Sequence, residues 1–340
     1  MSDPLSTTQP APVLSASRSR MARAAILAAA CAALFASAAE AQSWSEKPVR
    51  IVNPFPAGGA SDTLTRVMAD QLGRKLGQTF VVENITGASG NIGMDVGYKA
   101  APDGYTVISA TIGTLSVNQF LGKLSYEPEK MTYVSTFWSN CNVVFTSAAH
   151  NPARTLREFI AWGKAQPKGI SFGSSGVGTT PHLAGELFKL RTGIPAVHAP
   201  TRGGPQTVAL LLGGEISMSI DNIASYAAQI AGNQVRMLAT TCPERWPTLP
   251  DVPTMAEAGM PDFVLTSWGA MVMPPNTPAA IADKMSRAMA EIAADPEIQK
   301  RYMGAGARIT SSTPQQTRDF AAAERKRLGE VVLVSGAKAE

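Results

Sequence analysis

The chain has 340 residues, of which 45% are hydrophobic and 16% are charged. This length and this hydrophobic content are enough for one large domain or two medium domains with packed cores. The formal net charge of +4 is small and the charged fraction is low, so the composition indicates neither a disordered tail nor a nucleic-acid-binding protein.

The first 41 residues are typical of a secretory leader. Three arginines between positions 18 and 23 precede an apolar run over residues 24–36, and Ala39-Glu40-Ala41 forms an A-x-A cleavage site before Gln42. The apolar run is too short and too rich in alanine for a stable membrane anchor. We therefore expect a periplasmic protein that is cleaved before Gln42, with Met21 as the physiological start of the leader.

A strand, a glycine turn and a helix follow the leader. Val49 to Val52 has the apolar pattern of a buried strand, and Gly58-Gly59 lets the backbone turn sharply. Ser61 or Asp62 is expected to cap a helix that Gly77 ends. The N–H groups at the start of such a helix have no partner within it, so this turn favours an anion.

Strands and helices then alternate, which predicts a mostly parallel sheet covered by helices on both faces. The pattern restarts near residue 143, and a Pro-rich stretch carries the chain back over residues 243–261. Strands are expected at residues 49–52, 79–83, 105–110, 143–146, 170–173, 196–198, 216–220 and 235–240, and the last helices at residues 278–293 and 314–330.

The restart predicts an α/β fold with two lobes, each a mostly parallel sheet flanked by helices. Residues 42–142 with about 262–340 are expected to form lobe 1, and residues 143–261 are expected to form lobe 2. Two lobes joined by crossing strands make a cleft, and closure of such lobes over a solute is a known hinge mechanism. We therefore expect the ligand between the lobes.

The loops at the carboxyl ends of the predicted strands are the candidate ligand site. They are rich in Gly, Ser, Thr and Asn, so a carboxylate held there would meet backbone N–H groups, hydroxyls and helix N-termini. Arg202 is the candidate for a direct ion pair, and the alternative for each loop is a set of ordinary turn residues. The candidate ligand-binding residues are Phe55, Ala57, Gly58, Gly59, Ser61, Asn91, Ile92, Thr111, Gly113, Thr114, Ser174, Ser175, Thr179, His182, Arg202, Asp221 and Asn222.

Motifs for catalysis and for metal binding are incomplete. Gly173-x-Ser175 lacks the closing glycine of a nucleophile elbow, because Val177 stands in that position. The three histidines are not spaced as metal ligands. We expect no catalytic residues, no metal and no cofactor. An α/β hydrolase-like enzyme that uses His182 with Ser174 or Ser175 is the alternative from a different functional class.

Short blocks of residues follow one another in a fixed order after residue 42. They include Phe55-Pro56-Ala57-Gly58-Gly59-Ala60-Ser61-Asp62, Gly87-Ala88-Ser89-Gly90-Asn91, Ala101-Pro102-Asp103-Gly104-Tyr105, Phe172-Gly173-Ser174-Ser175-Gly176, Arg202-Gly203-Gly204 and Leu249-Pro250-Asp251-Val252-Pro253-Thr254. This ordered set resembles the signature of the tripartite tricarboxylate transporter receptors, also called the Bug family of periplasmic solute-binding proteins.

The resemblance implies a periplasmic-binding-protein fold and a non-enzymatic receptor, expected to be a monomer. Such a receptor captures a small organic carboxylate and presents it to the membrane permease subunits of a tripartite transporter. A chemosensory receptor that uses the same fold stays open as an alternative. The identity of the carboxylate stays open as well: a dicarboxylate, a tricarboxylate, an aromatic acid such as terephthalate, nicotinate or an amino acid.

Cys141 and Cys242 remain after the leader, in a compartment that permits disulfides. One lies where the chain leaves the first lobe and the other where it begins to return. Antiparallel crossing strands would bring their Cα atoms within the roughly 4.4–6.8 Å that a disulfide needs. Two buried free thiols are nevertheless the favoured interpretation, because buried cysteine is common.

The leader generates the first testable prediction. Mass spectrometry of the exported protein should give a chain that begins at Gln42, because Ala39-Glu40-Ala41 is an A-x-A cleavage site that follows the apolar run. Retention of residues 1–41 on the exported protein, or a lipid attached to Cys31, would contradict this assignment.

Overall fold

The computed structural model describes residue 44 and residues 47–335, so the predicted leader lies outside the described residues. The described chain forms one mixed sheet, in which the strand order is β2-β1-β3-β9-β4-β7-β5-β6 and β8 also pairs with β4. The strands are β1 (Val49–Asn53), β2 (Phe80–Asn84), β3 (Thr106–Thr111), β4 (Thr132–Ser147), β5 (Ile170–Ser174), β6 (Ala196–Pro200), β7 (Met218–Asn222), β8 (Val235–Thr240) and β9 (Thr266–Met273).

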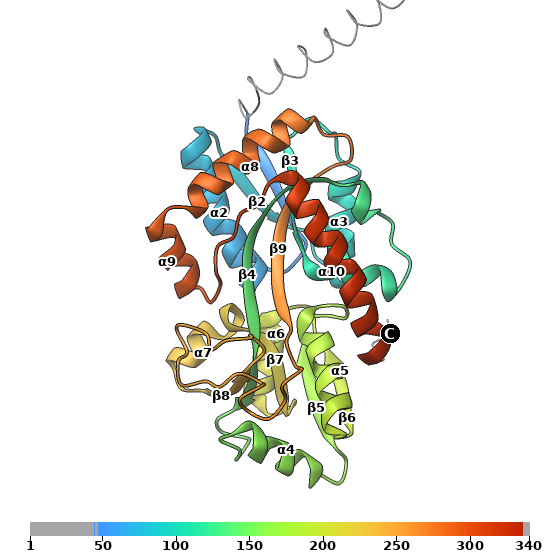
Figure 1. The fold of residues 1–340 in the computed structure, drawn as a ribbon, viewed down its shortest axis with the longest axis vertical. Helices are drawn as coiled ribbons and strands as arrows, with labels where there is room; N and C mark the ends of the chain where they lie inside the picture. The colour runs from blue at the N-terminus through green and yellow to red at the C-terminus, as the bar shows by residue number, and fades with distance from the viewer. Residues whose placement is uncertain (1–43, 45–46, 336–340) are drawn as a thin grey trace, which may run out of the picture. The chain divides into compact units, whose positions relative to one another are not determined.

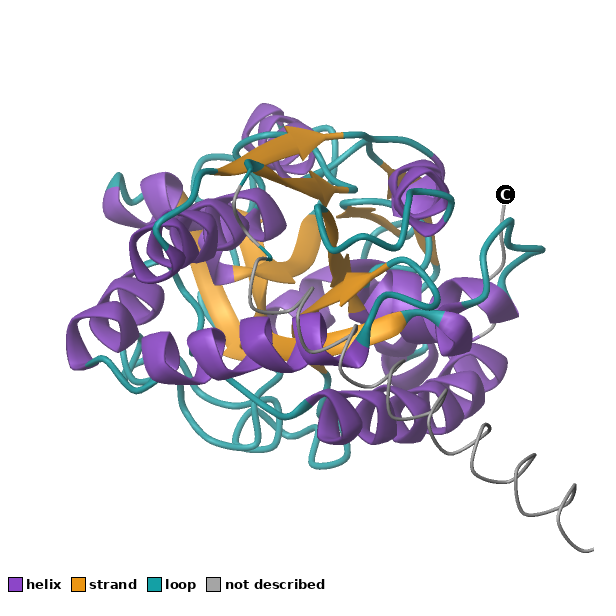
Figure 2. Ribbon diagram, turned by 90° about the horizontal axis from the view of Figure 1, so that it is seen from above, coloured by secondary structure: helices purple, strands orange, loops and turns teal. Residues whose placement is uncertain are grey.

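Helices lie on both sides of the strands, as Figure 2 shows. The α-helices are α2 (Ala60–Leu76), α3 (Asn91–Tyr98), α4 (Leu156–Lys164), α5 (Thr180–Thr192), α6 (Gly204–Gly213), α7 (Ala227–Ala231), α8 (Ala279–Ala293), α9 (Pro296–Gly304) and α10 (Pro314–Ser335). Short 3-10 helices occupy Ala88–Gly90, Asn118–Phe120, Pro128–Lys130 and Ile223–Tyr226, and a π-helix occupies Gly113–Val117.

Two groups of parallel strands define the two lobes. In one lobe β1 pairs in parallel with β2 and β3, and in the other β5 pairs in parallel with β6 and β7. The two-lobed α/β fold flanked by helices is therefore confirmed, and antiparallel pairings of β4 and β9 join the parallel strands of both lobes into one mixed sheet. The predicted lobe boundary after residue 142 falls inside β4, and the residue limits of the lobes stay a prediction.

β4 and β9 join the two lobes and run side by side between them (Figure 1). The first part of β4 pairs with β9, and its last residues, from Asn142, pair with β7 and β8. The sequence predicted a strand only from residue 143, so it missed most of β4 and all of β9. Both strands are buried along almost their whole length, so they lack the alternation of apolar and polar residues that marks a half-buried strand.

Helix α2 shows how the local sequence sets the fold. Leu64, Met68 and Leu72 recur at helical spacing and are fully buried. Gly77 adopts the left-handed conformation and ends the helix with an N–H bond to the Gly73 carbonyl, as predicted. At the start of α4 the Thr155 side chain accepts a hydrogen bond from the Glu158 amide and so caps the helix.

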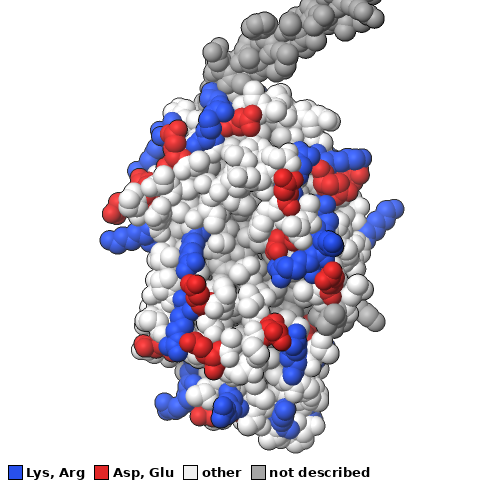
Figure 3. Space-filling view, viewed as in Figure 1, with Lys and Arg blue, Asp and Glu red and all other residues white. Residues whose placement is uncertain are grey.

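The surface carries both signs of charge. On the face shown in Figure 3, Lys and Arg side chains lie among Asp and Glu side chains, with uncharged surface between them. Within the residues that the structure describes, no helix is both long enough and apolar enough to cross a membrane.

A disulfide joins Cys141 and Cys242, whose Cα atoms are 5.3 Å apart. Cys141 lies on β4 at its pairing with β9, and Cys242 lies two residues after β8, which pairs with the other end of β4. The preference for two free thiols was therefore wrong. The crossing strands supply the proximity that the sequence could only suggest.

The disulfide generates the second prediction. It closes a segment with a sequence separation of 101, so replacing both cysteines by serine should lower the free energy of unfolding by about 2–5 kcal/mol. Denaturant unfolding of the oxidised protein and of the double variant measures this difference. Maleimide labelling of the denatured, unreduced protein is the control. Two labels on each chain would show that the disulfide does not form.

Candidate functional site

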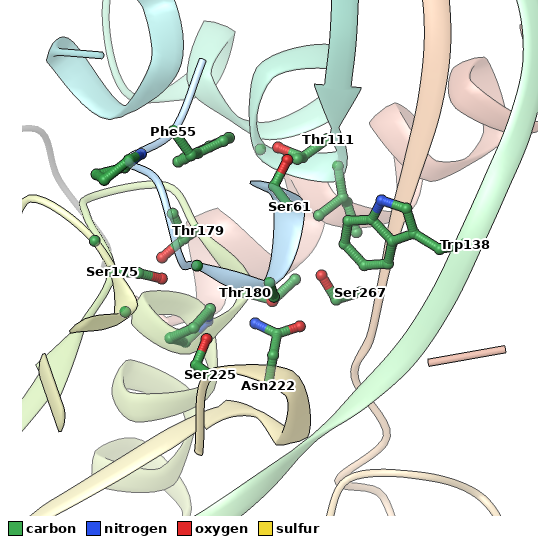
Figure 4. Close-up of a pocket in the computed structure, with 18 residues that line it drawn as sticks. Phe55, Ser61, Thr111, Trp138, Ser175, Thr179, Thr180, Asn222, Ser225 and Ser267 are labelled. Carbon is green, nitrogen blue, oxygen red and sulfur yellow. The ribbon is translucent and has the colours of Figure 1, made fainter. Parts of the chain in front are cut away.

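One pocket lies between the lobes, where three helices begin (Figure 4). The starts of α2, α5 and α6 all contribute to its wall, and the crossing strands contribute Trp138 and Ser267. None of the described residues that line it is charged. The lining residues are Phe55, Pro56, Gly59, Ala60, Ser61, Thr111, Ile112, Gly113, Trp138, Ser175, Thr179, Thr180, Pro181, Gly203, Gly204, Asn222, Ser225 and Ser267.

The three helices present their N-termini without side-chain caps. Their N-cap residues are Gly59, Thr179 and Gly203, and none of the three caps its helix through a side-chain hydrogen bond. Each helix N-terminus carries about half an elementary positive charge and N–H groups without a helical partner, although Pro181 and Pro205 leave fewer such donors in α5 and α6 than in α2. The pocket therefore has a positive potential of backbone origin, although none of its lining side chains is charged.

Ser61 and Asp62 do not cap α2, contrary to expectation. The Ser61 hydroxyl donates to the Asn53 side-chain oxygen at 2.8 Å. The Asp62 carboxylate accepts from the Gly58 amide at 2.9 Å and from the Asn84 side chain at 2.8 Å. Asp62 thus holds the glycine turn in shape from behind and is absent from the pocket lining.

The charge of Asp62 is stabilised by its partners. Burial by itself would raise the pKa of this carboxyl, but Arg66, the Gly58 amide and Asn84 together hold the pKa below its usual range. Arg66 Nε lies 3.0 Å from the carboxylate. Asn84 also donates to the Phe55 carbonyl at 2.8 Å, so the same network positions Phe55 at the pocket wall.

The far side of the pocket is built from β7, β9 and β4. Asn222 ends β7, Ser267 lies on β9 and Trp138 lies on β4. The Asn222 side-chain nitrogen donates to the Asp221 carboxylate at 3.1 Å, so the amide oxygen is turned away from that contact. Gly269 is required beside Trp138, because a Cβ atom at position 269 would overlap the indole ring.

Some of the predicted ligand-binding residues line the pocket, and others do not. Phe55, Gly59, Ser61, Thr111, Gly113, Ser175, Thr179 and Asn222 line it. Outside this lining lie Ala57, Gly58, Asn91, Ile92, Thr114, Ser174, His182, Arg202 and Asp221.

The predicted residues outside the pocket have identifiable positions. Ala57 and Gly58 are exposed in the turn. The Thr114 hydroxyl bonds the Thr111 backbone and is buried. Asn91 accepts from Asn118 and Tyr126, and Ile92 is exposed at 48%.

Arg202 is exposed and lies beside the pocket rather than in it. It lines a neighbouring hollow together with residues 86–90, and this hollow shares Phe55 and Ser175 with the pocket. The Arg202 amide donates to the Gln206 side chain at 2.9 Å. The predicted ion pair between Arg202 and a ligand would therefore have to form at the rim.

The buried residues Ser174 and His182 and the half-buried His198 form a cluster behind the wall. The Ser174 hydroxyl lies 2.7 Å from His198 Nε2, and His182 Nδ1 accepts from the Gly178 amide at 3.1 Å. The two imidazole rings are stacked, with centroids 4.3 Å apart. Ser174 is fully buried and does not line the pocket, so the arrangement offers its hydroxyl no substrate. These contacts fix the loop between β5 and α5.

Sequence reasoning missed several residues of the pocket. Trp138 and Ser267 lie on the crossing strands. The face of the sheet from which their side chains project cannot be predicted until the strand pairing is known. Thr180 and Pro181, at the start of α5, also line the pocket and were not among the predicted ligand-binding residues. Among the described residues, no group of three or more His, Cys, Asp or Glu side chains is placed to hold a metal ion.

The chain is similar in sequence to proteins of one family. Residues 64–336 match the family model described as the tripartite tricarboxylate transporter family receptor. Protein BugT of Bordetella pertussis is 33% identical over 305 residues, which cover 89% of this chain and 94% of that protein.

Solved structures show the same fold. R. palustris Rpa4515 with adipate has a TM-score of 0.85 at 30% identity, covering 87% of this chain and 99% of its own. MatC (Rpa3494) from Rhodopseudomonas palustris with bound malate has a TM-score of 0.80 at 26% identity, covering 85% of this chain and 100% of its own.

The buried histidines generate the third prediction. Burial, with a smaller effect of Lys189, lowers the pKa of His182 to about 4. Burial and then His182 lower the pKa of His198 to about 3. Below about pH 6.5 the unfolded chain therefore binds protons that the folded chain does not, and the free energy of unfolding should fall.

Asp221 acts in the opposite direction, because burial raises the pKa of its carboxyl to about 6. The folded chain takes up this proton first, which adds stability as the pH falls from about 6 to 4. The stability lost through the two histidines exceeds the stability gained through the one carboxyl. The free energy of unfolding, measured with urea, should therefore fall between pH 6.5 and pH 5. The loss should be smaller in the variant His182→Asn with His198→Gln. A stability that is constant or rises over this range in the unmodified protein would contradict the assignment.

Proposed function

Because the chain belongs to the tripartite tricarboxylate transporter receptor family, we propose that it binds a small organic carboxylate in the pocket between its lobes and delivers it to the permease subunits of a tripartite transporter. Periplasmic localisation, with cleavage before Gln42, is part of this proposal. The related proteins of known structure that hold adipate and malate support a carboxylate as the ligand class.

The observation that carries the proposal is the convergence of three uncapped helix N-termini on one pocket. A carboxylate placed there accepts hydrogen bonds from backbone N–H groups and is stabilised by three helix dipoles. The hydroxyls of Thr111 and Thr180 lie in the same wall, and the Ser61 hydroxyl, which donates to Asn53, presents its oxygen there. Such a site binds an anion without a fixed cation.

The contacts between the lobes explain how the pocket closes. A Cβ atom at Gly113 would lie 3.1 Å from the Gly178 carbonyl oxygen of the other lobe, and a Cβ atom at Gly203 would lie 2.8 Å from Pro56 Cγ. The loops of the two lobes therefore meet at glycines, which lets the backbones come together over a ligand. β4 and β9 are the connections about which such a closure would hinge.

The fourth prediction is that Gly59→Val abolishes carboxylate binding. Gly59 lines the pocket at the start of α2, so a branched side chain there occupies the space of the ligand. Isothermal titration calorimetry with a panel of carboxylates, including adipate and malate, measures the affinity of the variant and of the unmodified protein. Ala57→Val is the matched control, because Ala57 lies in the same turn but is exposed and outside the pocket. Unchanged affinity in a folded Gly59→Val variant would show that the ligand does not bind at the start of α2.

The fifth prediction compares a pocket hydroxyl with the rim cation. Ser61→Ala should weaken binding by about 0.5–1.5 kcal/mol, the net value of one neutral hydrogen bond, because it removes the bond to Asn53 that holds the start of α2 in the pocket wall. Arg202→Ala should cost less than about 1 kcal/mol, because an exposed ion pair at the rim contributes little. Calorimetry on both variants measures the two costs. A loss of about 1.5–3 kcal/mol for Arg202→Ala would instead show a charge-assisted bond to the ligand.

A further inference from the structure

Three asparagines gather on one face of the sheet at the far side of the pocket. Asn140 on β4 is the pairing partner of Ser267 on β9, and Asn142 on β4 is the pairing partner of Asn222 on β7. Directly opposed residues of antiparallel strands project from the same face. Ser267 and Asn222 line the pocket, so Asn140 and Asn142 lie on the pocket side of the sheet, behind the lining and not in it. Trp138, two residues before Asn140 on the same strand, also lines the pocket, as this facing requires.

The amide groups of these asparagines are buried and largely without protein partners. The exposed fractions are 2% for Asn140, 0% for Asn142 and 7% for Asn222. Within the described chain, both side-chain atoms of Asn140, both of Asn142 and the oxygen of Asn222 make no hydrogen bond. A buried polar group without a hydrogen-bond partner destabilises the folded protein, so a cluster of them indicates a binding surface for a polar group from outside the chain. We call Asn140, Asn142 and Asn222 the amide face.

Asp221 sets the polarity at Asn222. Its carboxylate accepts from the Asn222 backbone amide at 2.7 Å and from the Asn222 side-chain nitrogen at 3.1 Å. The Asn222 side chain is thus held with its oxygen free, and this oxygen is an acceptor. The other Asp221 oxygen is buried without a partner in the described chain. Burial raises the pKa of Asp221 to about 6, so the group is mainly ionised at pH 7.5.

A second carboxylate would be disfavoured at this end of the pocket. It would meet the Asn222 acceptor oxygen and the negative charge of Asp221, and none of the described lining residues is a cation. An uncharged hydroxyl or carboxamide would instead donate to that oxygen and also use the amides of Asn140 and Asn142. The helix N-termini of α2, α5 and α6 remain available for one carboxylate at the near end.

We propose that the amide face determines the specificity of the pocket, and that it selects a monocarboxylate with an uncharged hydrogen-bonding group at its far end over a dicarboxylate of the same chain length. This inference rests on the proposed carboxylate-receptor function. Asn222 contacts the distal group of the ligand, Asn140 and Asn142 complete its hydrogen bonds, and Asp221 is a positioning residue that acts through Asn222.

Calorimetry on the exported full-length protein at pH 7.5 tests the ligand ranking. The probes are 4-hydroxybutanoate, succinate and butanoate as one matched set, and 6-hydroxyhexanoate, adipate and hexanoate as the other. In the set whose length fits the pocket, the hydroxy acid should bind at least about tenfold more tightly than both the dicarboxylate and the unsubstituted acid. This ranking needs no variant.

Variants then assign the ranking to the amide face. Asn222→Leu and Asn142→Leu remove hydrogen-bonding atoms at similar volume, so each should reduce the preference for the hydroxy acid over the unsubstituted acid to within about threefold. Asp221→Asn removes the charge, so it should narrow the discrimination against the dicarboxylate. Ala57→Val is the control and should keep both ratios. Ratios of affinities are measured because a general structural defect lowers all affinities together.

The outcomes separate this inference from the receptor function. A dicarboxylate that binds more tightly than its matched hydroxy acid in the unmodified protein would overturn the inference and leave the receptor function standing. An unchanged preference for the hydroxy acid over the unsubstituted acid in both folded leucine variants would also overturn the inference and leave the receptor function standing. If none of the acids binds, the proposed function fails, and the inference fails with it.

Discussion

Unpaired N–H groups at the starts of α2, α5 and α6 are the interaction on which the structure of the pocket depends. A single helix N-terminus attracts an anion weakly, but three that begin at the wall of one pocket act together. Other parts of the fold hold these N–H groups in position. Asp62 braces the turn before α2 from behind, and the Ser174, His182 and His198 cluster fixes the loop before α5. Both devices place titratable groups outside the pocket, so the lining itself stays uncharged.

The two lobes are held by a small number of connections. β4 and β9 pass between them, and the disulfide from Cys141 to Cys242 ties β4 to the segment after β8. Where the lobes touch across the pocket, glycines such as Gly113 and Gly203 leave room for the opposing backbone or for Pro56. This combination of stiff connections and small contact residues suits a protein whose lobes move as units around a ligand.

Elements that depend on local residue patterns could be predicted from the sequence. Features that depend on which strands pair with each other could not. Helical spacing and Gly77 located α2, and the loops at strand ends contained Gly59, Ser61 and Thr179 of the pocket wall. The side on which a residue lies was harder to predict.

Neighbouring residues at a strand end point to opposite faces, so Ser175 lines the pocket whereas Ser174 is turned inward. Asn222 and Asp221 differ for the same reason. Trp138 and Asn140 were out of reach, because no local pattern reveals the partner of a strand that is buried on both faces.

A crystal structure of the protein with a bound carboxylate would test the central claim most directly. The account predicts that the carboxylate oxygens lie within about 2.7–3.2 Å of backbone nitrogen atoms in the first turns of α2, α5 and α6. It also predicts that the far end of the ligand points toward Asn222. A carboxylate bound instead against the Arg202 side chain in the neighbouring hollow, with the helix N-termini unused, would contradict the account.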